Sequence, residues 1–130
     1  MRFLPLVFIC TFSSFLYSQS NTEIFLFDIE INTSKIELKN GTNISNNAGY
    51  DNQPSFYNDN LVLFASTRNN QTDIAIYSIK DKKVTYVNST PEGGEYSPQK
   101  IPNSNNVSAV RLDNDGKQRL YSYDFKTGES

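Results

Sequence analysis

The sequence contains no histidine and no tryptophan, and only one cysteine. Without histidine, these 130 residues cannot supply a Ser-His-Asp triad, an imidazole base or a histidine metal ligand. The cysteine, Cys10, precedes residue 21, so residues 21–130 cannot form a disulfide among themselves and depend on packing. The net charge of −2 gives no indication of nucleic-acid or anionic-membrane binding.

The first 20 residues differ from the rest. Arg2 precedes a mostly apolar stretch, residues 3–16, and small or polar residues follow it. This pattern predicts a secretory signal peptide, cleaved after Ser18 or Ser20, and its short length disfavours a membrane span. We therefore expect a periplasmic or secreted protein with no transmembrane span after cleavage. A buried N-terminal strand or helix is the alternative interpretation.

The remaining residues, 21–130, read as strands and turns, with no segment of helical periodicity longer than a turn or two. Strands are expected at residues 22–29, 35–39, 61–66, 73–79, 84–87, 107–112 and 118–125. The Asn-rich stretch up to Asn60 and residues 91–94 are expected to be turn and loop. The strand 61–66 is apolar on both faces, with Leu63 on one and Phe64 on the other. It therefore predicts packing on each side.

Residues 50–77 and 95–123 repeat each other. Pro54 and Pro98 lie 44 positions apart, and each is followed by a polar turn, an apolar strand, a second turn and a second apolar strand. A strand-and-turn repeat of this length is typical of a β-propeller blade. The fold class predicted is all-β, with about two to two and a half four-stranded antiparallel blades of an incomplete propeller.

The repeated residues resemble the TolB-like, WD40-like propeller repeats of bacterial envelope proteins. In the first unit the pattern comprises Pro54, Phe56, Asp59, the apolar residues 61–64, Ser66, Arg68, Asp73, Ile74 and Tyr77. In the second unit it comprises Pro98, Arg119 and Tyr123, with Leu112 and Asn114 in place of Ser66 and Arg68, and Arg119 in place of Asp73. We assign these repeat residues a structural role and predict no catalytic, cofactor-binding or metal-binding residue.

The resemblance implies a scaffold that binds other periplasmic or envelope proteins, without catalysis, a cofactor or an identifiable small-molecule ligand. The alternative is the propeller domain of a prolyl-oligopeptidase-like serine peptidase whose catalytic domain lies beyond residue 130. Because propellers close with several more blades, we expect a longer native chain. We also expect inner strands such as 61–66 to be uncovered on one side.

Four local features have both a functional and a structural interpretation. Arg68 and Asp73 flank one turn and are expected to pair with each other or with backbone, rather than with a ligand. Residues 113–116, Asp-Asn-Asp-Gly, resemble the start of a calcium loop, but a hairpin turn is favoured. Glu92 and Glu95 could act as an acid/base pair, although a solvated loop is favoured. A fourth feature is aromatic: Tyr50, Tyr57 and Tyr96 could stack on a ligand or pack a sheet edge.

Overall fold

The computed structural model describes residues 21–130; the predicted signal peptide lies outside them. Across the described residues the fold is all-β, with nine strands and no helix. The strands are β1 (Phe25–Asn32), β2 (Lys35–Asn43), β3 (Asp51–Asn58), β4 (Leu61–Arg68), β5 (Gln71–Ser78), β6 (Lys83–Tyr86), β7 (Gly94–Lys100), β8 (Asn106–Leu112) and β9 (Gln118–Asp124). The seven strands expected from the sequence correspond to β1, β2, β4, β5, β6, β8 and β9.

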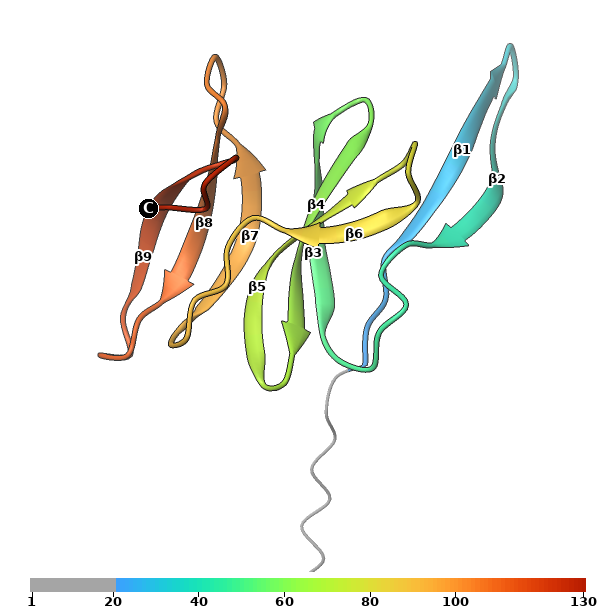
Figure 1. Cartoon of the computed structure of the whole chain (residues 1–130). Helices are drawn as coiled ribbons and strands as arrows, with labels where there is room; N and C mark the ends of the chain where they lie inside the picture. Colours follow the sequence, from blue (N-terminus) through green and yellow to red (C-terminus); the bar gives the residue numbers. More distant parts are fainter. Residues whose placement is uncertain (1–20) are drawn as a thin grey trace, which may run out of the picture.

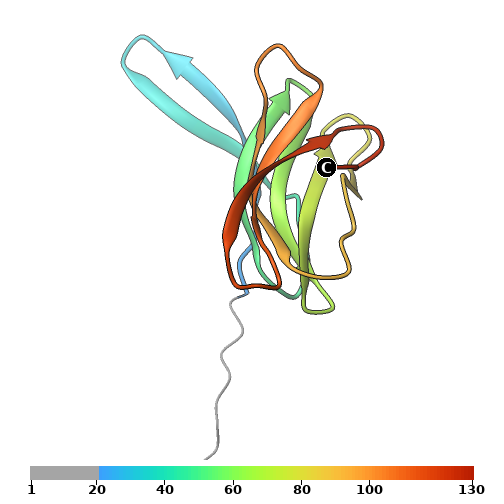
Figure 2. The ribbon, with the colours of Figure 1, turned by 90° about the vertical axis from the view of Figure 1, so that its left-hand side faces the viewer.

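Three groups of strands lie side by side (Figure 1). The central group is an antiparallel meander in the order β3-β4-β5-β6. The antiparallel strands β7, β8 and β9 flank it on one side, and a single parallel bridge between Thr72 and Gly94 joins them to β5. On the other side the hairpin β1–β2 projects away from the other strands (Figure 2).

The central meander is covered on both faces, because two apolar clusters lie on opposite sides of β4 and β5. The first cluster faces β7–β9 and contains Tyr57, Leu63, Ile74, Ile76, Val87, Val107, Ala109 and Tyr123. The second faces β1–β2 and contains Ile24, Ile44, Val62, Phe64, Ala75 and Tyr77. The predicted alternation in strand 61–66 is confirmed. The expectation that one side of this strand is uncovered is wrong, since Leu63 and Phe64 are both fully buried.

The same hydrogen bonds recur at both boundaries between groups. Ile44 N donates to Ile24 O and Val87 N donates to Ile74 O, each at 2.9 Å. Ile24 N donates to Ser45 Oγ at 3.0 Å, and Ile74 N donates to Asn88 Oδ1 at 3.1 Å. The parallel bridge between Thr22 and Tyr50 likewise matches the bridge between Thr72 and Gly94. The hairpin β1–β2 is therefore related to β3 as β5–β6 is related to β7.

Strand β3 lies in the stretch predicted to be turn and loop, and that prediction is wrong, whereas β7 lies mostly in residues for which no element was predicted. Both contain the repeated proline, which lacks the N–H that a strand interior requires. The chain accommodates Pro54 and Pro98 at a shift in strand register, just after Gln53 (φ 56°) and Ser97 (φ 52°) in the left-handed region. A bulge at each proline thus keeps the strand paired on either side of it.

We expect Leu63→Ala to lower the free energy of unfolding by about 2–5 kcal/mol, because it leaves a cavity between two packed sheets. Leu120→Ala is the matched control, since Leu120 is 75% exposed, and should change the free energy by less than about 0.5 kcal/mol. Urea unfolding of the full chain followed by circular dichroism measures both. Equal effects of the two substitutions would contradict the buried position of Leu63.

Candidate functional site

A buried polar cluster lies where β5–β6 meets β7. Glu95 is fully buried at the start of β7, and Thr90 Oγ1 lies 3.0 Å from each of its carboxylate oxygens. The hydroxyl of Tyr123 donates to Glu95 Oε1 at 3.1 Å, and Arg111 Nε lies 3.7 Å from the same oxygen. Burial raises the pKa of Glu95, while the hydrogen bonds from Thr90 and Tyr123 oppose that rise. Burial also raises the pKa of Tyr123.

Two further side chains hold the loop before β7 against β5. Thr90 N donates to Asp73 Oδ1 at 3.0 Å, and Asn88 accepts from the backbone of Ile74. Gly93 has φ 88°, and a Cβ there would lie 2.6 Å from the carbonyl oxygen of Leu112, so only glycine permits this close approach. The cluster therefore joins two neighbouring groups of strands, which is a structural role.

A second buried carboxylate, Asp51, occupies the equivalent position at the start of β3. Arg68 Nη1 donates to Asp51 Oδ1 at 3.0 Å, and the Ser66 hydroxyl also donates to this oxygen. Arg68 and Asp73 were predicted to pair with each other or with backbone, and the structure shows the backbone alternative: Arg68 donates to Thr67 O and Asp73 accepts from Thr90 N.

The strand register also revises the alignment of the two repeats. Asp51 pairs with Ser66, and Glu95 pairs with Arg111. Arg111 is therefore the residue equivalent to Ser66. The sequence alone had aligned Leu112, one residue later, with Ser66. The importance of Asp51 was missed by sequence reasoning, although a signal was present: Asp51 and Glu95 each lie three positions before a repeated proline.

The Asp-Asn-Asp-Gly sequence is a turn, as favoured from the sequence. Gly116 N donates to Asp113 O at 2.9 Å, and Gly116 has φ 77°. The carboxylates of Asp113 and Asp115 both accept hydrogen bonds from Arg119, so these two acidic groups pair with a cation of the chain itself. Across residues 21–130, no group of three or more acidic or cysteine side chains is placed to hold a metal ion.

Glu92 and Glu95 do not form an acid/base pair. Glu92 is exposed and accepts a hydrogen bond from Asn114, whereas Glu95 is buried. The solvated-loop interpretation is therefore correct for Glu92 and wrong for Glu95. The signal that separates them is the repeat, because Glu95 lies three positions before Pro98, as Asp51 lies three positions before Pro54.

The predicted tyrosines lie in two different environments. Tyr57 is buried and stacks on Phe125, with ring centroids 4.1 Å apart, so it packs the sheet. Tyr50 and Tyr96 are half-buried and meet edge to face, with centroids 6.4 Å apart. Tyr96 lines a surface groove of about 460 Å³ whose other lining residues are Gln53, Ser97, Val110, Leu112 and Gln118. We call this groove, formed where β3 and β7 bulge, the bulge groove.

The bulge groove combines apolar side chains with hydrogen-bonding groups. Gln53 Oε1 accepts from Ser97 N at 2.8 Å, so the two bulges contact each other directly. Tyr96, Val110 and Leu112 supply apolar surface, while Gln53 and Gln118 supply amides. A site of this composition suits a peptide or a polar loop of another protein.

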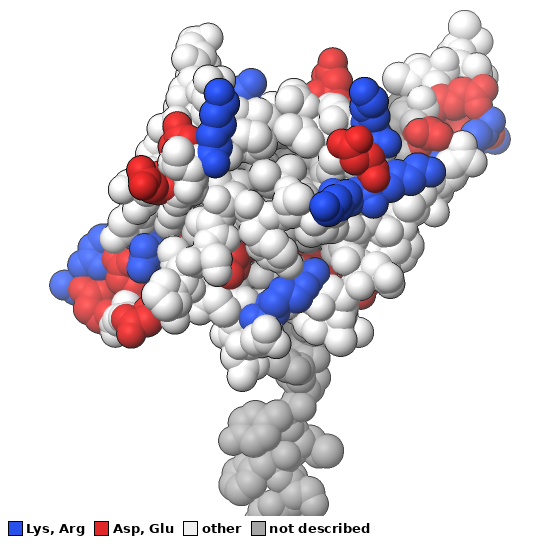
Figure 3. Space-filling model, viewed as in Figure 1, with Lys and Arg blue, Asp and Glu red and all other residues white. Residues whose placement is uncertain are grey.

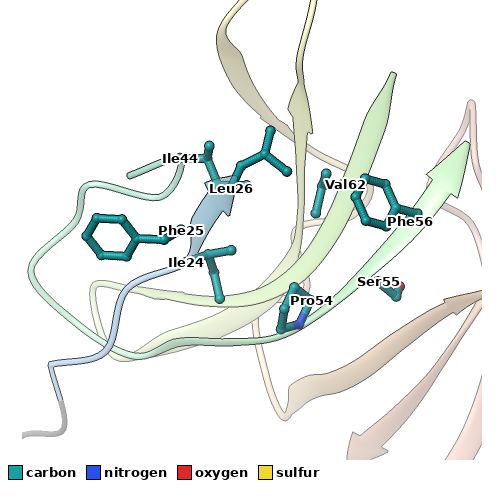
Figure 4. A pocket seen from close by; sticks show the side chains of 8 residues that line it. All are labelled: Ile24, Phe25, Leu26, Ile44, Pro54, Ser55, Phe56 and Val62. Atoms are coloured by element: carbon teal, nitrogen blue, oxygen red, sulfur yellow. The ribbon is translucent and has the colours of Figure 1, made fainter. Parts of the chain in front are cut away.

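The repeat residues predicted from the sequence do not form one site. Ser66, Tyr77, Pro98 and Tyr123 are buried, Phe56 and Pro54 are exposed, and Arg119 forms surface ion pairs with Asp113 and Asp115. Phe56 and Pro54 do share a second cavity, of about 140 Å³, with Ile24, Phe25, Leu26, Ile44, Ser55 and Val62 (Figure 4). This apolar cavity lies between the hairpin β1–β2 and the central meander.

Charges of both signs are interspersed on the face shown in Figure 3, with Lys and Arg side chains beside Asp and Glu. No helix in the described part of the chain could cross a membrane. Comparison with known protein families found no family model that matches this sequence. A search of curated proteins also found no similar protein.

We expect Arg68→Ala to lower the free energy of unfolding by about 1–3 kcal/mol, because the buried Asp51 loses a charged donor. The control is Lys117→Ala, whose exposed ion pair with Asp115 spans 3.9 Å and should contribute less than about 0.5 kcal/mol. Chemical denaturation of the full chain gives both values. An effect of Arg68→Ala as small as that of the control would argue against its role in stability.

Glu95 should make stability depend on pH. Because burial raises the pKa of Glu95 above its ordinary value of 4.5, the folded chain binds this proton more tightly than the unfolded chain. The contribution of Glu95 to the free energy of unfolding therefore falls as pH rises from 4.5 to the raised pKa of the folded state. We expect wild type to lose stability relative to Glu95→Gln between pH 4.5 and the raised folded-state pKa.

Urea unfolding of wild type and Glu95→Gln at a series of pH values measures this difference. Glu129→Gln, at an exposed position, is the control and should follow wild type at each pH. If the free energies of unfolding of wild type and Glu95→Gln changed in parallel with pH, Glu95 would have the same pKa in the folded and unfolded states, which would contradict the prediction.

Proposed function

We propose that residues 21–130 form β-propeller blades and that the protein is an exported, non-enzymatic scaffold that binds other envelope proteins. The observation that carries this proposal is the recurrence of one set of hydrogen bonds at both boundaries between strand groups. On this interpretation β3–β6 is one blade, β1–β2 is the outer half of the blade before it, and β7–β9 is the inner part of the blade after it.

The hydrogen bonds of the buried carboxylates favour a scaffold function rather than an active site. Asp51 is bound by Ser66 and Arg68, and Glu95 by Thr90 and Tyr123, so both stabilise contacts between strands. Buried groups used in this way are not presented to a substrate. The TolB-like pattern of Pro54, Ser66, Arg68 and Asp73 adds support for an envelope protein, and the apolar residues 3–16 support export.

The bulge groove is the surface we assign to partner binding. It lies where β3 and β7 bulge beside each other, and the half-buried Tyr96 supplies a rigid aromatic contact of the kind enriched in protein interfaces. The neighbouring Tyr50 holds Tyr96 by an edge-to-face contact. A partner would thus meet side chains that are already positioned.

We expect a photo-crosslinking amino acid at position 96 to form adducts with an envelope protein in cells of the native source. The same probe at position 82, on the exposed turn before β6, should form none. The measurement is fractionation of the cells, followed by mass spectrometry of the adducts. Recovery of the chain from the cytoplasm, or equal adducts at both positions, would contradict the proposal.

A further inference from the structure

The second strand of the hairpin β1–β2 contains a bulge. The strand register shifts at Phe27, which lies opposite two residues of β2, Asn40 and Gly41. Asn40 has φ 52°, in the left-handed region that asparagine tolerates better than most residues. A Cβ at Gly41 would overlap the ring of Phe27, so only glycine fits there without moving that ring. The bulge thus gives a structural reason for the order Asn-Gly at these two positions.

The order Asn-Gly is also the one in which asparagine is most reactive. The backbone nitrogen of the residue that follows an asparagine can attack the carbonyl carbon of its side chain. Glycine has no Cβ to hinder this approach. No other asparagine of the sequence precedes a glycine. The bulge therefore holds the asparagine of the chain that is best suited to this reaction.

We propose that Asn40 is a site of spontaneous deamidation and that its contacts in the hairpin control the rate. The nitrogen of Gly41 forms a bond to Cγ of Asn40. The bond from Cγ to Nδ2 breaks, and ammonia leaves with the amide proton of Gly41. Water then opens the cyclic imide at either carbonyl, which leaves aspartate or isoaspartate at position 40. Water is the only co-reactant.

A hydrogen bond to β1 restrains the reacting amide. Asn40 Nδ2 donates to Asp28 Oδ2 at 2.8 Å, so the nitrogen that must leave is held by the neighbouring strand. The backbone is also held, because Thr42 Oγ1 donates to Asn40 O at 3.2 Å. An amide fixed in this way cannot rotate freely toward the nitrogen of Gly41. We therefore expect the folded hairpin to slow the reaction relative to a flexible peptide.

The reacting side chain lies on the charged face of the hairpin. Asp28, its partner, shares this face with Glu30, since residues two apart in a strand point the same way. Glu30 accepts a hydrogen bond from Lys39 Nζ on the same face. Asn40 and Gly41 are both exposed. The water that opens the imide can therefore reach it.

Either product would alter the hairpin. Aspartate replaces the Nδ2 donor by an oxygen, so two carboxylates of like charge would meet where Asn40 and Asp28 now share a hydrogen bond. Isoaspartate also inserts a methylene group into the backbone at the bulge, which changes the spacing of the strand pair. Leu26, on the other side of Phe27 in β1, packs against the second apolar cluster. Deamidation would thus loosen the contact between the hairpin and the central meander.

The test is incubation of the full chain in mildly alkaline buffer, followed by digestion and tandem mass spectrometry. We expect Asn40 to deamidate at least about tenfold faster than Asn70. Asn70 is the matched control, because it is also exposed and has φ 63°, but glutamine follows it. A free peptide of residues 36–44 gives the rate without the hairpin, and Asn40 should react faster in it than in the full chain.

Substitution of Asp28 tests the hydrogen bond that restrains the amide. We expect Asp28→Ala to speed deamidation of Asn40 by about twofold to tenfold, because one hydrogen bond to the amide is lost. Glu30→Ala is the matched control: it removes a carboxylate and an ion pair with Lys39 from the same face, but leaves the contact of Asn40 with Asp28. Its rate should stay within about twofold of wild type.

Three results would overturn the inference. The first is a rate at Asn40 no higher than at Asn70. The second is an equal rate at Asn40 in the peptide and in the full chain. The third is equal acceleration by Asp28→Ala and Glu30→Ala, which would make general loosening of the hairpin the controlling factor. None of these measurements depends on the scaffold function proposed above.

Discussion

The packing of β4 and β5 between two neighbouring groups of strands is the constraint on which the other features depend. Leu63 and Ile74 face β7–β9, while Phe64 and Ala75 face the hairpin, and all four are fully buried. A sheet buried on both faces needs a neighbour on each side, which defines the stacking direction of the whole chain. The carboxylates of Asp51 and Glu95 are buried because they lie at the boundaries that this stacking creates.

The pattern of apolar residues predicted the strands well where these residues alternate with polar ones or form a continuous run. Residues 61–66 and 73–79 are apolar on both faces and became β4 and β5. Strands β3 and β7 could not be predicted in the same way, because proline and several polar residues interrupt them. Their pairing comes from a bulge with positive φ at Gln53 and Ser97, a conformation that neither residue type indicates.

The candidate site was harder to predict than the fold. Arg68 and Asp73 flank one turn, and the prediction from the sequence was that they pair with each other or with backbone. Their observed partners, Asp51 and Thr90, lie 17 positions away in each case. Such contacts depend on strand register and on the passage from one group of strands to the next, which a local pattern does not contain. The bulge groove is likewise assembled from β3, β7, β8 and β9.

The bulge at Pro54 in β3 has a consequence for solubility. Among residues 21–130, strand β3 pairs with β4 on one edge, and past Asp51, whose N–H donates to Thr22 O, no strand pairs with its other edge. That edge can therefore pair with other chains during folding or at high concentration. Pro54 removes a donor from this strand, and the bulge before it breaks the regular spacing that a flat intermolecular sheet requires. The irregularity that concealed β3 in the sequence is thus a local defence against amyloid-like aggregation.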